Sequence, residues 1–304
     1  KKMRPFSKSF FIAHILMAAL IILIHIPGQK SVEDPKAFFA GIVVIELIYL
    51  YQLVRKRKSP LALSDIMIIL WSILLLWEIS TTQLNLMHPV LVPSPENVFH
   101  VFATQYDVLL LGVLSSMELL LVGVLFGIGF GVGLGLPVGW IPRLRDIFYP
   151  IANVLTPIPP VVFAPYLIAL MPTFRSASAV VIILTIFWPT FLSIIIRVNS
   201  IEPRILDSAR VLNVSNRTMI RKILLPYVIP SVISGLKVTI TTSVMMLTFA
   251  EMMGATSGMG FYIINYTHYA NYTNVVAGII LVGIVVTVLN WLVNIIQIKT
   301  IKWH

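Results

Sequence analysis

The sequence of 304 residues contains no cysteine, and charged residues make up only 11% of it. The lack of cysteine excludes a disulfide framework, a thiolate metal site and a cysteine nucleophile. The scarcity of charge, set against 58% hydrophobic residues, excludes a soluble globular domain, because such a chain cannot present a polar surface to water. The composition is typical of an all-α protein that crosses a membrane several times.

Motifs for nucleotide, metal or hydrolytic chemistry are also lacking. No P-loop follows the glycine-rich run 123–135, so we expect neither nucleotide hydrolysis nor a nucleotide cofactor on this chain. The histidines show no metal-site spacing, and no Gly-x-Ser-x-Gly elbow marks a nucleophile. The glycines at 123, 127, 131 and 135 instead favour close packing of one helix against a neighbour. We therefore expect no catalytic or metal site, and an intramembrane hydrolase is a minor alternative.

Runs of about 20 apolar residues, the length that crosses a bilayer, occur eight times. They cover approximately 9–27, 37–54, 62–80, 108–136, 147–171, 178–196, 228–250 and 274–297. Lysine and arginine cluster on one side of these spans, and only Lys30, Lys36 and Arg175 fall on the other. The positive-inside rule then predicts eight spans with both termini in the cytoplasm. The net charge of +10 thus reflects topology and does not indicate nucleic-acid binding.

Two parts of the chain are expected to differ in role. Residues 1–60 form an N-terminal hairpin of two spans that ends in the basic run Arg55 to Lys58, and we interpret it as an accessory piece. Residues 61–304 form a separate six-span core. A cleaved signal peptide at the first span is the alternative, although no small-x-small cleavage site follows it.

The span 147–171 contains five prolines, and a sixth, Pro172, follows directly after it. Proline removes a backbone donor and clashes with the preceding turn, so this helix must be kinked or broken. Broken helices are tolerated in a bilayer where protein or a water-filled cavity satisfies the freed carbonyls. The segment from Thr156 to Pro165 is thus a candidate for lining a path or forming a gate, with equal weight on a kinked, packed helix.

Acidic residues inside spans are costly and indicate function by default. Glu118 lies in the fourth span, Glu46 in the second and Glu78 near the outer end of the third. Glu251 ends the seventh span and leads into the small-residue stretch 254–260, which is typical of a turn. Each acid is a candidate for solute contact, and each is also expected to stay neutral or pair locally if it has no such role.

A basic, polar stretch from Glu202 to Lys222 separates two apolar runs. Pro203 suits a helix start, and Asn213 can end that helix in a left-handed conformation. Ser215 or Asn216 can cap a second short helix that stops before Pro226. Two short amphipathic helices suit a knob inserted into a partner's groove. The alternative is a surface hairpin whose basic residues face lipid headgroups.

The chain from about Trp71 onward resembles the permease subunits of binding-protein-dependent ABC importers of the nitrate/sulfonate/taurine group. The matching features arrive in order: Leu70-Trp and Trp77-Glu, Val92-Pro-Ser-Pro95, Ser115-Ser-Met-Glu118, Pro157-Ile-Pro-Pro160 with Ala164-Pro165, Phe187-Trp-Pro189, the loop with its Leu225-Pro226, and Ala250-Glu-Met-Met-Gly254 with Ser257-Gly-Met-Gly260. The polar loop is similar to the family's coupling (EAA) loop. Where the family has Glu-Ala-Ala and then Gly, this chain has Asp207-Ser-Ala209 and Asn213.

The resemblance implies a type I importer fold in a bacterial plasma membrane. Its partners would be a second permease copy, a dimer of ATPase subunits that carries ATP and Mg, an extracellular solute-binding protein, and membrane lipid. Residues 200–226 would form the coupling loop, with Asp207, Ser208, Ala209, Asn213, Leu225 and Pro226 shaping it. The expected path or gate residues are Glu118, Pro159, Pro160, Phe163, Trp188, Glu251 and Met252.

The family's solutes include small anions, sulfonates and vitamins or their precursors, and the sequence does not choose among them. An ion-coupled secondary transporter that uses Glu118 and Glu251 is one alternative function. A non-transporting membrane scaffold is the other.

Overall fold

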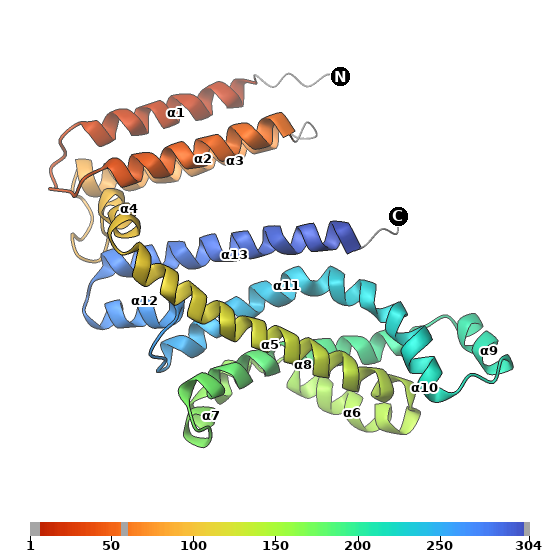
Figure 1. Ribbon diagram of the computed structural model, residues 1–304. Coiled ribbons are helices and arrows are strands. Elements are labelled where there is room, and N and C mark those ends of the chain that lie inside the picture. The colour runs from red at the N-terminus through yellow and green to blue at the C-terminus, as the bar shows by residue number, and fades with distance from the viewer. Residues whose placement is uncertain (1–6, 56–59, 301–304) are drawn as a thin grey trace. The chain divides into compact units, whose positions relative to one another are not determined.

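The computed structural model describes residues 7–55 and 60–300, and within these ranges the chain forms helices and no strand. The first part contains α1 (Lys8–His25), α2 (Lys36–Arg55), α3 (Pro60–Glu78) with a π turn η1 (Ile79–Gln83), and α4 (Pro95–Thr104). The longest helix, α5 (Tyr106–Trp140), follows (Figure 1). The remaining elements are α6 (Pro142–Leu155), η2 (Pro160–Phe163), α7 (Ala164–Leu170), α8 (Phe174–Asn199), α9 (Pro203–Val211), α10 (Asn216–Thr218), η3 (Met219–Leu224), α11 (Leu225–Met252), α12 (Met259–His268) and α13 (Tyr272–Thr300).

Seven helices of the described chain are long and apolar enough to cross a membrane. An eighth crossing arises if the bent pair 142–155 and 160–170 counts as one span. The two halves of this pair meet at 84° around the prolines at 157, 159 and 160. The predicted break in the proline-rich span is therefore confirmed, because the missing N–H groups leave the helix unable to continue there.

Contacts divide the chain into two compact units. One comprises residues 1–109 with 263–280, and the other comprises 110–262 with 281–304. From the sequence we expected a boundary near residue 60, between an accessory hairpin and the core. This boundary stays a prediction.

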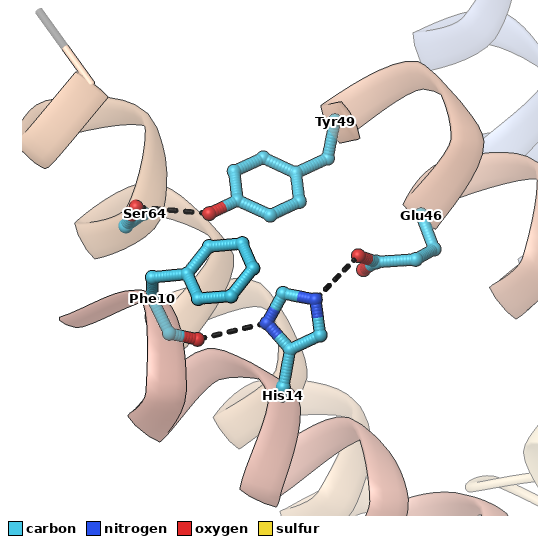
Figure 2. Close-up of polar contacts among 5 residues, drawn as sticks. All are labelled: Phe10, His14, Glu46, Tyr49 and Ser64. Carbon is cyan, nitrogen blue, oxygen red and sulfur yellow. Dashed lines mark hydrogen bonds and ion pairs between the residues drawn. The ribbon is translucent and has the colours of Figure 1, made fainter. Parts of the chain in front are cut away.

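The first unit contains a partly buried polar interaction between α1 and α2 (Figure 2). His14 Nδ1 lies 2.8 Å from the Phe10 carbonyl oxygen, and His14 Nε2 lies 3.1 Å from a carboxylate oxygen of Glu46. Because the carbonyl can only accept, Nδ1 is the donor of the first bond. One turn along α2, the Tyr49 hydroxyl lies 2.9 Å from that of Ser64 on α3. These contacts place polar side chains beside one another inside an apolar bundle.

The second unit is built around close packing of α5 on α8. A Cβ placed on the α5 glycines would meet α8 side chains at distances that real Cβ atoms essentially never show: Gly127 meets Ile186 at 2.6 Å, Gly131 meets Thr190 at 2.8 Å, and Gly135 meets Ile194 at 2.9 Å. The packing role predicted for these glycines is therefore confirmed. Side chains of α5, α8, α11 and α13 complete an apolar cluster that includes Leu119, Ile182 and Val244.

Candidate functional site

Residues 203–226, which we term the coupling knob, begin with α9. The inward face of this helix carries Leu206 and Ala209, three residues apart. Ala209 is only 4% exposed and lies in an apolar cluster with Met219, Leu224 and residues of the neighbouring spans. A small side chain is required at this position because α9 packs directly against the segment that follows it. The inner side of the knob therefore packs into an apolar cluster that it shares with α5, α8 and α11.

The turn after α9 is fixed by Asn213. Its φ is +50°, the left-handed conformation that the sequence predicted. The Val214 N–H donates to the Ala209 carbonyl at 3.1 Å, and the Leu212 N–H donates to Ser208 at 3.2 Å. The six-residue bond spanning a left-handed residue is that of a Schellman motif, in which an Asn can replace the usual Gly.

The second part of the knob differs from the prediction. The side chain of Ser215 accepts a hydrogen bond from the Thr218 N–H, so this residue is the expected N-cap. The helix does not stop before Pro226, however; it runs through η3 into α11. The Leu225 N–H donates to the Ile220 carbonyl, five residues back. This five-residue spacing is that of a π turn, and it lies directly before Pro226, whose nitrogen cannot donate.

The outer surface of the knob carries most of the residues that the sequence predicted to shape it. Asp207, Ser208 and Asn213 are exposed, as is Pro226, whereas Leu225 is partly buried. Two apolar side chains stand out: Val211 is 86% exposed and Leu212 is 75% exposed. The sequence interpretation missed this pair, although two adjacent apolar residues at the end of a polar helix were the signal.

Two hydrogen bonds tie the knob's surroundings to the α5–α6 turn. The indole N–H of Trp140 donates to the Asn216 side-chain oxygen at 3.0 Å. The Arg145 guanidinium donates to the Asn199 side-chain oxygen at 2.5 Å. The sequence did not predict these two pairings, because each joins positions more than 50 residues apart. The first bond joins the knob to the end of α5, and the second joins α6 to the end of α8.

Glu251, expected on the path, is buried in the structure with 0% exposure. Its carboxylate accepts from the Ser116 hydroxyl at 2.6 Å and from the Gly260 N–H at 2.8 Å. The Ser116 oxygen also accepts from the Met259 N–H at 2.9 Å. These bonds hold the turn between α11 and α12, where Gly258 has a φ of +118°.

The other expected path residues occupy separate surroundings. Glu118 forms an ion pair with Arg175, the second residue of α8. Trp188 is partly buried and packs against a cluster of α5, α6 and α8 side chains, with its ring centroid 4.9 Å from that of Phe187. Pro159, Pro160 and Phe163 lie at the break between α6 and α7, and the partly buried Met252 ends α11. The structure therefore gathers the residues predicted to shape a coupling loop into one knob but does not bring the predicted path residues into one site.

Comparison with known proteins gives the knob its context. The model of a family described as "Binding-protein-dependent transport system inner membrane component" matches residues 123–299. The chain belongs to this family. The match contains the whole coupling knob and leaves residues 1–60 outside.

Individual permeases of the family are similar over much of their length. The taurine transport system permease protein TauC of Escherichia coli (strain K12) is 26% identical over 239 residues, covering 75% of this chain and 85% of the relative. The nitrate import permease protein NrtB of Leptolyngbya laminosa is 30% identical over 189 residues, covering 62% of this chain and 68% of the relative.

A chain of the MetNI methionine ABC transporter, solved in inward-facing conformations, has a similar fold. Its TM-score is 0.50 at 21% identity, with coverage of 64% of this chain and 97% of that chain. The resemblance read from the motifs is thus confirmed: this is a binding-protein-dependent ABC importer permease, a multi-pass protein of the plasma membrane.

Proposed function

We propose that this permease couples solute movement to a separate ATPase through the coupling knob. The observation that carries the proposal is the exposed pair Val211 and Leu212, displayed at the end of a helix whose other face is packed. Large apolar side chains at a protruding tip suit insertion into a partner's groove. A hairpin resting on headgroups would instead bury these side chains in lipid.

The mechanism that we propose is alternating access. ATP and Mg bind on the partner ATPase, and closure of its dimer moves the groove that holds the knob. The bonds Trp140–Asn216 and Arg145–Asn199 then carry the displacement to the ends of α5 and α8. This chain contributes no catalytic residue; its Asp207, Ser208, Ala209, Asn213, Leu225 and Pro226 shape the knob.

The assembly that we propose contains two copies of this permease, two ATPase subunits and an extracellular binding protein that delivers a small solute. The chain crosses the membrane eight times with both termini in the cytoplasm, and residues 1–60 form its accessory hairpin. The solute is an anion, a sulfonate, or a vitamin or its precursor.

The path and gate are proposed to include Pro159, Pro160 and Phe163 at the broken span. Glu118, Trp188, Glu251 and Met252 complete the proposed set. Glu118 is engaged by Arg175, and Glu251 by Ser116 and Gly260. These partners argue against an ion-coupled transporter, because a carboxylate that carries an ion must be free to exchange it.

Replacement of both Val211 and Leu212 by glutamate is expected to separate the permease from its ATPase. Loss of two buried apolar anchors weakens docking by roughly a hundredfold. Co-purification of the ATPase subunit in mild detergent, with ATP-driven uptake in vesicles, measures the effect. Lys8→Glu, an exposed charge change outside the knob, is the control and should leave both unchanged. Normal recovery of the ATPase with the double variant would disprove the docking role.

Substitutions at Asn213 should follow its backbone conformation. Asn213→Gly is expected to retain uptake, because glycine adopts the left-handed turn without strain. Asn213→Val is expected to loosen the knob, since a left-handed conformation costs an ordinary L-residue about 1–2 kcal/mol. Trypsin cleavage after Arg217 in the purified protein reports this loosening. Equal cleavage of the two variants would show that the turn does not depend on this conformation.

A further inference from the structure

Hydroxyl groups in the spans of the second unit are mostly satisfied within their own helices. Thr185, Thr241, Thr248 and Thr287 each donate to the carbonyl four residues back, at 2.7 to 2.9 Å. This is the usual way for a threonine to lie in an apolar helix. Within the described chain, Thr190, Ser193 and Thr239 differ, because their hydroxyls make no hydrogen bond.

These three hydroxyls line one groove. It lies between α8 and α11, has a volume of ≈ 110 Å³, and is bounded on the α5 side by Ile128. A Cβ placed on Gly131 would lie 2.9 Å from the methyl carbon of Thr190. This methyl group therefore faces α5. On α11, Gly235 leaves the groove open, since a Cβ built on it meets nothing within 4 Å.

Hydrocarbon cannot satisfy the polar groups in this groove. A hydroxyl that faces lipid loses its hydrogen bonds, whereas one that faces a water-filled cavity keeps them. Ser193, Pro189 and Gly235 are exposed in the single chain, so the groove opens at its surface. Three unbonded hydroxyls at one opening are therefore better explained by an aqueous surface than by lipid.

We propose that this groove is a solute-contacting wall of the translocation path. The inference rests on the transport function proposed above and adds a place and a ligand chemistry to it. The lining residues of the described chain include no ionisable side chain, so the groove holds the solute weakly and transiently. Each free hydroxyl offers a hydrogen to donate, and unsatisfied donors are tolerated less well than unsatisfied acceptors. The groove therefore suits a small, acceptor-rich group of oxygen atoms at one end of the solute. Water fills the groove between transport events.

The absence of cysteine from these 304 residues allows a direct test. The variant Gly235→Cys adds a thiol to a residue that lines the groove, at a position where a Cβ meets nothing within 4 Å. The probe is the sulfonate-bearing thiol reagent 2-sulfonatoethyl methanethiosulfonate, applied to the assembled transporter in vesicles. It should modify the thiol at position 235 quickly, because the reacting thiolate requires water. The matching reagent that carries a trimethylammonium group should modify this thiol more slowly. For this comparison, the rate of each reagent is first divided by its rate with a free thiol in solution.

The variant Gly133→Cys is the matched control. Gly133 lies on α5 between the positions that meet Thr190 and Ile194, so its depth is similar, and a Cβ there also meets nothing within 4 Å. Its helix face carries the exposed Phe126, Phe130 and Leu134, which suit lipid. The sulfonate reagent should modify the thiol of Gly235→Cys roughly tenfold or more faster than that of Gly133→Cys, because charge is costly in hydrocarbon.

Three outcomes would overturn the inference. Equal, slow modification of both variants would place the groove in lipid, and a disulfide between two copies of Gly235→Cys would place it in a packed interface between them. Faster reaction of the cationic reagent would contradict the acceptor-rich ligand. None of these outcomes depends on ATPase coupling, which uptake by the unmodified protein measures separately, so failure of the inference and failure of the proposed function are distinguishable.

Discussion

Replacement of Ala209 by arginine should abolish ATP-driven uptake. Ala209 lies on the buried face of α9, in one cluster with Met219 and Leu224. An arginine at this position has neither space nor a counter-charge. An uncompensated buried charge costs about 3–5 kcal/mol, which corresponds to roughly a hundredfold or more in the population of the folded knob. The substitution therefore acts by opening the knob and thereby removes its docking surface.

Two control variants separate this mechanism from a direct block of docking. Ala209→Ser keeps the small volume and should retain uptake. Ser208→Arg places the same charge on the exposed neighbour, where it can hinder docking but leaves the interior of the knob packed. Limited trypsin digestion of the purified variants, alongside uptake in vesicles, should show an opened knob in Ala209→Arg alone. Persistent uptake by Ala209→Arg would refute the assignment of residues 203–226 as the coupling element.

Glu251→Ala should destabilise the whole permease. It removes the acceptor of the Ser116 hydroxyl and of the Gly260 N–H, both of which lie in the buried interior. Each orphaned polar group costs about 1–3 kcal/mol. For a chain of this size, that loss lowers the midpoint of thermal unfolding by on the order of 10 °C. The expected cause is release of the turn that joins α11 to α12.

Comparison of matched acids tests this role. Glu251→Gln can still accept from Gly260 and donate to Ser116, so its stability should lie near that of the natural protein. Glu118→Ala removes an exposed ion pair with Arg175 and should change the midpoint little. Thermal unfolding followed by size-exclusion chromatography in detergent ranks the three variants. A midpoint for Glu251→Ala equal to that of Glu118→Ala would show that the buried carboxylate does not hold this turn.

Local chemistry explains which features of the knob were predictable. The start at Pro203, the left-handed turn at Asn213 and the cap at Ser215 depend on neighbouring residues, so the sequence predicted them. The continuation of the helix past Pro226 was not predicted, because a π turn depends on how η3 packs against its cluster. The exposure of Val211 and Leu212 was missed for a related reason: burial is a property of the fold and not of the residue.

The sequence by itself determined the family, the helical class, the break in the proline-rich span and the packing role of the α5 glycines. These features follow from apolar run length, proline geometry and glycine spacing, all of which act over a few turns of chain. Tertiary structure alone decided which acids have partners, how the α5–α6 turn joins the knob, and where unbonded hydroxyls converge. Glu251 meets Ser116, and Trp140 meets Asn216, across 135 and 76 residues. Contacts of this range depend on the register between whole helices, which no local pattern specifies.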